Sequence, residues 1–125
     1  MFDIRIDKPE NGRCLVSLSG RLDTATAPLC EQKLLPALAA PGFRVLVCDM
    51  SGLDYISSMG LRLIFKARKA LESQNRSFLM VRLPPQIAKV FEIAAALPKE
   101  AIFSSLEEAD RYLALMQRKT LENQA

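Results

Sequence analysis

Two adjacent hydroxyls, Ser57 and Ser58, stand where a stretch typical of a strand meets a stretch typical of a helix. Serine at a helix start can cap the unpaired N–H groups of the first turn, act as a nucleophile, or accept a phosphoryl group from another enzyme. The chain contains no histidine, which removes the usual Ser-His and Cys-His pairs, histidine-containing metal sites and a phosphohistidine carrier. Whatever the two serines do, no histidine activates them.

Capping is the ordinary role of serine at such a junction, and spacing alone favours it for one member of the pair. One cap needs one hydroxyl, so the second serine is surplus to that role. Ser57 directly follows the strand and is the better placed cap. Ser58 falls in the first helical turn, where we expect it to expose its hydroxyl, and a helix N-terminus favours a phosphate there.

The remaining polar candidates carry weaker signals. Asp23 or Thr24 precedes a helix and is ordinarily a cap. Asp49 is a single carboxylate, which is too little for a metal site. Arg62 and Lys66 line one face of a helix, which favours a solvated surface over a docking stripe. We therefore predict no metal, no cofactor and no catalytic residue.

Composition narrows the class of protein. A chain of 125 residues fits one domain, and a net charge of +3 without a dense basic block gives no sign of nucleic-acid binding. No apolar run approaches the ~18 residues of a membrane span, and the N-terminal residues alternate like a strand rather than a signal peptide. Three cysteines without CxxC spacing, Cys14, Cys30 and Cys48, are expected to be buried thiols in a reducing cytoplasm.

The first elements that position these groups are two strands and a helix. Apolar residues alternate over 2–6 and 14–19 on either side of a turn, which predicts an antiparallel hairpin. A helix is predicted over 25–39. Pro36 lies inside it and is expected to kink it or end it early.

The middle of the chain supplies the strand and helix that flank the two serines. Residues 43–48 are nearly all apolar, as expected of a central strand covered on both faces. Residues 49–53 are predicted to form a loop. Helical spacing then predicts a buried face on the second helix that consists of Leu61, Ile64, Ala67 and Leu71.

The last third repeats the alternation. A strand is predicted over 77–83, followed by a helix that starts at Pro84-Pro85 and buries Ile87, Val90, Phe91 and Ala94. A short strand is predicted at 101–103, and a capping box at 105–108 begins a last helix with a buried face of Ala109, Tyr112, Leu113 and Met116. Residues 119–125 are polar and predicted to form a disordered tail.

Strands that alternate with helices indicate crossover connections. The sequence predicts an α/β fold: a small mixed, mostly parallel sheet of four to five strands, an opening antiparallel hairpin and four helices. Residues 1–118 are predicted to form a single domain.

Three segments resemble the marks of STAS-domain anti-sigma factor antagonists: GRLDTATAP (20–28), VCDMSGLDYISSMGLRLI (47–64) and FSSLEEADRYL (103–113). The likeness runs in order over roughly residues 2–116, and the middle segment is the most specific. It implies the same small mixed sheet with helices packed on it. The missing histidines and the absence of clustered carboxylates separately predict no enzymatic activity of the chain's own.

The resemblance implies a function by partner switching. The unphosphorylated antagonist would bind an anti-sigma factor with serine kinase activity and so free a sigma factor. Phosphorylation of a serine at the start of the second helix would end the interaction, and a serine phosphatase would restore it. The protein would act in the cytoplasm without contacting nucleic acid itself.

The phosphoacceptor position departs from the commonest family pattern. Many members carry the acceptor serine directly before the glycine, whereas alignment on Gly60 puts Met59 there. Relatives with Ser-Ser-Ala-Gly resemble this chain more closely, and their acceptor corresponds to Ser58, with Ser57 as the alternative. The resemblance implies a partner surface made of Asp23, Thr24, Ser57, Ser58, Met59, Gly60, Leu61, Arg62 and Lys66.

Two other functions remain open at this point. Met59 in the usual acceptor place also fits a STAS subunit of a lipid transporter or a larger signalling complex, which needs no phosphorylation. A small hydrolase that uses a serine or a cysteine is disfavoured, because neither candidate loop carries a histidine or a paired lysine base.

Overall fold

The computed structural model describes residues 1–96 and 106–123. In this part of the chain four strands form one sheet in the order β1-β2-β3-β4. β1 (Phe2–Ile6) pairs antiparallel with β2 (Arg13–Leu22), and β2, β3 (Val45–Ile56) and β4 (Ser77–Val81) pair in parallel. Helix α1 (Ala27–Ala39) connects β2 to β3, and α2 (Ser58–Glu72) connects β3 to β4. The predicted mixed sheet with an opening hairpin is confirmed.

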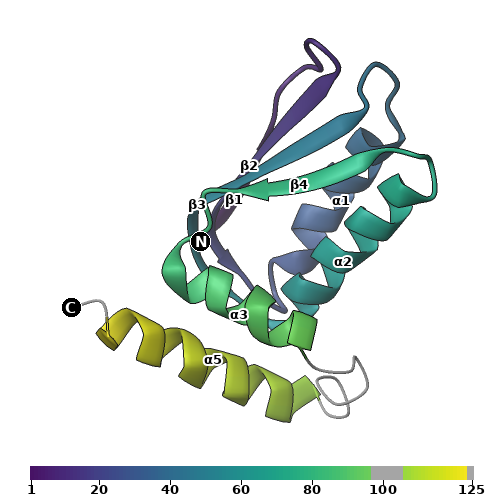
Figure 1. Ribbon diagram of the computed structural model, residues 1–125. Coiled ribbons are helices and arrows are strands. Elements are labelled where there is room, and N and C mark those ends of the chain that lie inside the picture. The colour runs from purple at the N-terminus through teal and green to yellow at the C-terminus, as the bar shows by residue number, and fades with distance from the viewer. Residues whose placement is uncertain (97–105, 124–125) are drawn as a thin grey trace.

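Helices α1 and α2 lie side by side against one face of the sheet (Figure 1). Alternate residues of each strand point to that face and form the core, as Val16, Leu46 and Phe78 do. The predicted face of α2 is buried as expected. The opposite sheet face carries a half-exposed apolar row in register, Leu15, Val47 and Leu79.

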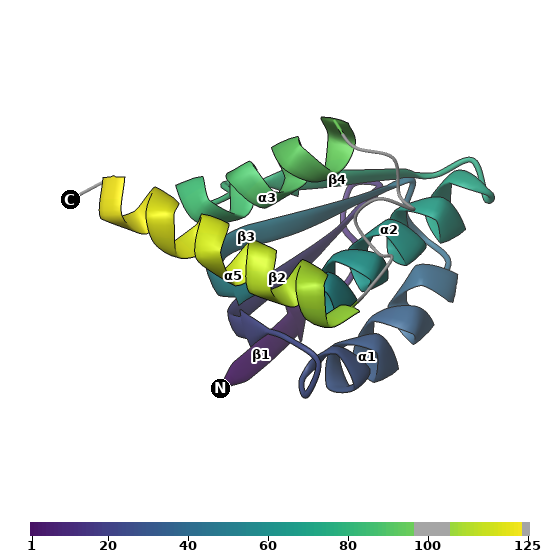
Figure 2. The same cartoon turned by 90° about the horizontal axis from the view of Figure 1, so that it is seen from below.

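The two remaining helices, α3 (Pro85–Ala96) and α5 (Leu106–Asn123), pack on each other near the end of β3 (Figures 1 and 2). β4 pairs only with the first five residues of β3, so no strand among residues 1–96 and 106–123 pairs with that edge along the last part of β3. Gln86 of α3 donates to Asp54 O at 3.2 Å there. A side chain of a helix therefore forms a hydrogen bond to a backbone group of this edge, where a neighbouring strand would otherwise pair.

The loop predicted at 49–53 is wrong, because β3 runs through it to Ile56. Pairing with β2 continues after two shifts of register, opposite Leu18 and again before Arg21. Each shift places one extra residue in β3, which is the arrangement of a β-bulge. Asp49 stabilises the first bulge, since its Oδ1 accepts from Ser51 N at 2.9 Å. Polar residues and a glycine here mark bulges in a strand rather than a turn.

Helix α1 ends at Ala39 as predicted and begins at Ala27 rather than at residue 25. Pro36 does not end it early: the helix continues to Ala39, and its last turn buries Leu38 in the core. Arg76 stabilises this end by donating to Ala40 O at 2.8 Å. The residue at the N-cap is Thr26, rather than Asp23 or Thr24, and its side chain makes no capping hydrogen bond.

The C-terminal helix is longer than predicted. α5 continues to Asn123, so residues 119–123 are helical and the predicted tail from residue 119 is wrong over that range. Tyr112 is 48% exposed rather than buried, whereas Leu113 is buried as predicted. The strand predicted at 101–103 and the serine of the capping box at 105–108 lie outside the described residues.

Candidate functional site

The start of α2 begins with the expected cap. Ser57 has extended backbone and its Oγ accepts from Gly60 N at 3.3 Å. Its own N–H donates to Leu22 O at 2.9 Å, which ties the helix start to the end of β2. The prediction that Ser57 is the cap is confirmed.

Gly60 lies in the first turn of α2, at a position that has no room for a side chain. A Cβ at this position would lie 2.8 Å from both the carbonyl oxygen and a side-chain carbon of Leu22. Such a contact with backbone is too close to be relieved by a side-chain rotation. Only glycine lets the first turn of α2 approach β2 this closely.

Ser58 is held by a residue far along the chain. Its Oγ donates to Asp110 Oδ1 at 2.6 Å, and its backbone N–H donates to the same oxygen at 2.8 Å. Asp110 belongs to α5. Because its carboxylate accepts from Ser58 N–H, it lies at the N-terminus of α2, the positive end of that helix's dipole. Ser58 is 0% exposed, and the expectation that its hydroxyl faces solvent is wrong.

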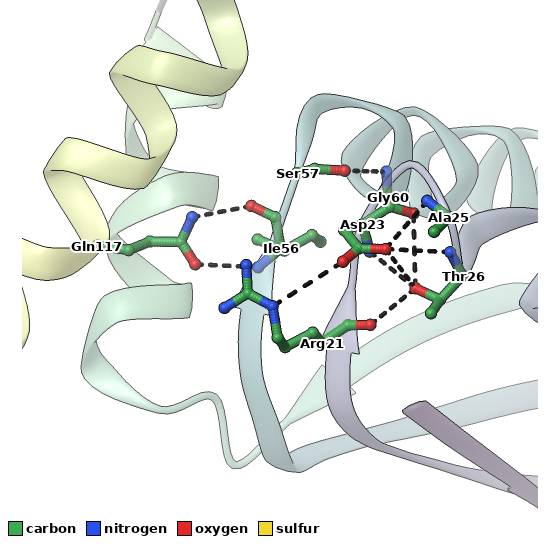
Figure 3. A network of polar contacts seen from close by, with 8 residues as sticks. All are labelled: Arg21, Asp23, Ala25, Thr26, Ile56, Ser57, Gly60 and Gln117. Atoms are coloured by element: carbon green, nitrogen blue, oxygen red, sulfur yellow. Dashed lines mark hydrogen bonds and ion pairs between the residues drawn. The ribbon is translucent and has the colours of Figure 1, made fainter. Parts of the chain in front are cut away.

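A second polar contact fastens α5 beside the same junction. The buried Gln117 accepts from Ile56 N at 3.0 Å through Oε1 and donates to Ile56 O at 2.8 Å through Nε2 (Figure 3). One amide side chain thus satisfies both backbone groups at the unpaired edge of β3. The residues on either side of Ser57 are therefore both bonded to α5.

The loop before α1 is held by its own residues (Figure 3). Asp23 Oδ1 accepts from the backbone N–H groups of Ala25 and Thr26, each at 3.0 Å, and from Thr26 Oγ1 at 3.1 Å. Arg21 reaches Asp23 Oδ2 at 3.9 Å and lies 4.1 Å over the Tyr55 ring. Asp23 therefore stabilises the turn that leads into α1 without being the N-cap residue.

A shallow groove of about 180 Å³ lies between α1 and α2. It is lined by Ala27, Pro28, Glu31, Met59, Arg62, Leu63 and Lys66. Lys66 Nζ lies 2.5 Å from Glu31 Oε1, so an ion pair of exposed side chains links the two helices. The groove combines apolar floor atoms with charges of both signs, which is a composition suited to a protein partner.

The three cysteines carry no sign of nucleophilic chemistry. Cys14, Cys30 and Cys48 are buried as predicted, and burial raises the pKa of the Cys30 and Cys48 thiols to about 12. Such thiols stay protonated and unreactive at neutral pH. Burial also raises the pKa of Tyr55, and the charge of nearby Asp110 adds to that shift.

The structure brings part of the predicted partner surface together. Met59, Arg62 and Lys66 line the groove, and Thr24 is exposed on the neighbouring loop. Leu61 is 0% exposed and Gly60 is buried, so these two contribute to packing and offer a partner no surface.

Sequence reasoning missed Asp110 and Gln117. Both lie on the same stripe of α5 as the buried Leu113, at spacings of three and four residues. A polar residue at a position where helical periodicity predicts burial is a signal for a specific hydrogen-bond partner. That signal was present in the sequence, although it does not say which partner is bonded.

Within the described part of the chain, no helix has the length and apolar character needed to cross a bilayer. The same residues contain no cluster of three metal-ligating side chains.

The family model of the STAS domain matches residues 5–109. The chain belongs to the STAS domain family. One curated relative of this STAS protein is BtrV of Bordetella bronchiseptica, named as a candidate anti-sigma factor antagonist, with 33% identity over 99 residues that cover 79% of this chain and 84% of BtrV. Another is the anti-sigma-B factor antagonist of Bacillus subtilis, with 27% identity over 74% of this chain and 84% of the relative.

Solved structures confirm the STAS fold. An anti-sigma factor antagonist from Mycobacterium paratuberculosis superposes with a TM-score of 0.69 at 22% identity, covering 91% of this chain and 95% of that one. Unphosphorylated SpoIIAA superposes with a TM-score of 0.61 at 18% identity over 72% of this chain and 82% of that one. At these identities the likeness concerns the fold.

Proposed function

We propose that this STAS protein is an anti-sigma factor antagonist, a regulatory module that binds an anti-sigma factor and thereby releases a sigma factor. The observation that carries the proposal is the alignment of most of the chain with curated relatives that bear this name. A protein with this function would act in the cytoplasm, and this is the location that we propose.

The partner surface that we propose is the groove between α1 and α2 together with the Asp23 loop. Arg62 and Lys66 are exposed on its rim, and Met59 contributes apolar contact area. Acidic groups of an anti-sigma factor would complement the two cations and speed association. Because Lys66 already pairs with Glu31, docking would exchange that ion pair for one across the interface.

Ser58 is the phosphoacceptor that we propose, and the anti-sigma factor is its kinase. Transfer would form a bond between Oγ and the γ-phosphorus of ATP, break the bond from that phosphorus to the bridging oxygen, release ADP and pass the hydroxyl proton to a base. The phosphate adds about −1.5 to −2 charges beside the groove. A partner that binds closely there would face this charge without a counterion, and a serine phosphatase would reverse the effect.

Ser57 is the less suitable acceptor because its hydroxyl caps α2 within the core. The hydroxyl of Ser58 instead bonds to a different helix, which can separate from it without unfolding α2.

We propose no enzymatic activity for the chain itself. Ser58 and Asp110 form a hydroxyl–carboxylate pair, but the pair is buried while α5 is docked and is separated when α5 leaves. A carboxylate is also a much weaker base than the histidine that ordinarily activates serine.

Recovery of partners from the native cell with the tagged full chain tests this proposal. The expected result is an anti-sigma factor that, with ATP, adds one phosphate mapped to Ser58 and then releases the chain. Recovery of a permease and an ATPase, with no anti-sigma factor, would instead establish a transporter subunit. A phosphate on Ser57 would overturn the acceptor assignment alone.

A further inference from the structure

Helix α5 is bonded to the two residues on either side of Ser57, which are Ile56 and Ser58. Asp110 accepts two hydrogen bonds from Ser58, and Gln117 exchanges two with Ile56. These pairs join residues 52 and 61 positions apart in the sequence. The only apolar residue of α5 that the described core contains is Leu113, between them. α5 also packs on α3, but the hydrogen bonds that the structure describes between α5 and the end of β3 and start of α2 are those of Asp110 and Gln117.

The docked helix and a kinase compete for the same hydroxyl. A kinase must bring the acceptor oxygen into line with the γ-phosphate of ATP, which requires an exposed side chain. Ser58 is 0% exposed, and its Oγ already donates to Asp110 at 2.6 Å. In this arrangement the chain is not a substrate, so transfer requires α5 to separate from the start of α2.

The carboxylate of Asp110 also occupies the place that a phosphate would favour. It accepts the Ser58 N–H at the N-terminus of α2, where backbone N–H groups and the helix dipole attract an anion. A phosphoryl group on Oγ would add a second anion within bonding distance of the first. The two would repel each other in a partly buried setting, and phosphorylated Ser58 would keep α5 away.

We propose that α5 is a built-in cover for the phosphorylation site, with Asp110 as its charged contact. Docked, it withholds Ser58 from the kinase; undocked, it exposes the hydroxyl and the edge of β3 at Ile56. Phosphorylation then makes the undocked state persistent. The inference rests on the proposed function for its biological meaning, but docking and its sensitivity to charge are properties of the isolated chain.

Amide hydrogen exchange of the isotope-labelled full chain, followed by NMR, tests this cover. The reporter is the Ile56 amide, which donates to Gln117 of α5. The Leu46 amide, near the start of β3 where β2 and β4 pair on both sides, reports global unfolding. Ser58→Asp places a carboxylate against Asp110 and should accelerate Ile56 exchange roughly tenfold or more, the worth of a hydrogen bond to a charged group. Ser58→Asn has the same size without the charge and should accelerate it much less.

Charge rescue separates a switch from a simple structural cap. Adding Asp110→Asn to the Ser58→Asp chain removes the repulsion and supplies an N–H donor, so Ile56 exchange should return to within about threefold of the Ser58→Asn value. Equal acceleration by Ser58→Asp and Ser58→Asn, or no rescue by the second substitution, would overturn the proposal.

A measurement on the unaltered chain covers the case in which Ser58→Asp does not fold. The Ser58 and Ile56 amides should then exchange with one common opening constant, well above that of Leu46, because the same separation of α5 exposes both. Independent opening constants would refute the cover. The exchange experiment contains no partner and no kinase. A result that refutes the cover would therefore not affect the anti-sigma factor proposal, which the partner recovery described above tests separately.

Discussion

Helices α1 and α2 both follow a parallel strand, yet their first turns are stabilised in different ways. The turn before α1 is held by Asp23 and Thr26, three residues apart. The start of α2 has one local cap, Ser57, and one supplied by Asp110 across 52 positions of the sequence. The first start is self-sufficient, whereas the second is complete only while α5 is docked.

The difference teaches how a modifiable serine can be kept buried. A local cap stays in place whenever its helix is folded, so it cannot respond to a distant event. A cap from another element breaks when that element leaves, and local openings of this kind cost less free energy than global unfolding. The contrast between the two helix starts gives four expectations, in order of decreasing effect.

Gln117→Ala should have the largest effect on stability, because Gln117 holds α5 beside the start of α2. It leaves the N–H and C=O of Ile56 without partners in a buried setting, and each unsatisfied group costs ~1–3 kcal/mol. We expect the free energy of unfolding to fall by about 2–4 kcal/mol in urea titrations. Lys119→Ala, exposed on the same helix, is the matched control and should change it by less than about 0.5 kcal/mol. Equal losses would show that Gln117 is not an anchor.

Asp110→Ala should come second, with a loss of about 1.5–3 kcal/mol, because the two donors of Ser58 lose a charged acceptor. The same change should raise the initial rate of phosphorylation by the recovered anti-sigma kinase, measured from intact-mass spectra. Arg111→Ala, exposed on the next position, should leave that rate unchanged. A slower reaction of Asp110→Ala would mean that Asp110 assists the transfer instead of hindering it.

Asp23→Ala should cost about 1 kcal/mol, the usual worth of a capping side chain, and its effect should stay local to the start of α1. Thermal unfolding measures the loss, with the exposed Thr24→Ala as control. If exchange of the Ile56 amide also changed, the two helix starts would be coupled and the contrast between them would fail.

Charge reversal on the groove should have the smallest effect on stability. Lys66→Glu replaces an exposed ion pair with two like charges, the new carboxylate and that of Glu31, and at an exposed site this should cost about 1 kcal/mol or less. Association with the anti-sigma factor should nevertheless slow, most clearly at low salt, when Arg62 is reversed as well. Surface plasmon resonance at two salt concentrations measures this. Unchanged association would place the docking face elsewhere.

The features predicted correctly from the sequence are those that depend on residues close together in the chain. Alternation and helical spacing indicated the strands, the buried face of α2 and the Ser57 cap, since each depends on residues within one or two turns. The loop predicted over 49–53 was wrong because the residues of a bulge resemble those of a turn. Only the pairing with β2 shows that the strand continues. Of the two effects predicted for Pro36, the early end is wrong, because continuing the helix to Ala39 buries Leu38 in the core.

The burial of Ser58 could not be predicted in the same way. Serine before a helix is ordinarily exposed, and nothing near residue 58 indicates that α5 covers it. Asp110 and Gln117 were not part of the buried face predicted for the last helix, and their helical spacing from Leu113 does not say which groups they bond. A contact across 52 positions depends on how the helices pack, which no local pattern encodes.

The most direct test of the central claim compares two amides in one molecule. Ser58 N–H is bonded to Asp110 of α5, and Thr26 N–H to Asp23 of its own loop. Hydrogen exchange by NMR on the unaltered chain and on Asp110→Ala should show Ser58 accelerating roughly tenfold to a hundredfold, while Thr26 keeps its rate. Unchanged protection of Ser58, or an equal change at Thr26, would contradict the account that α5 alone completes the start of α2.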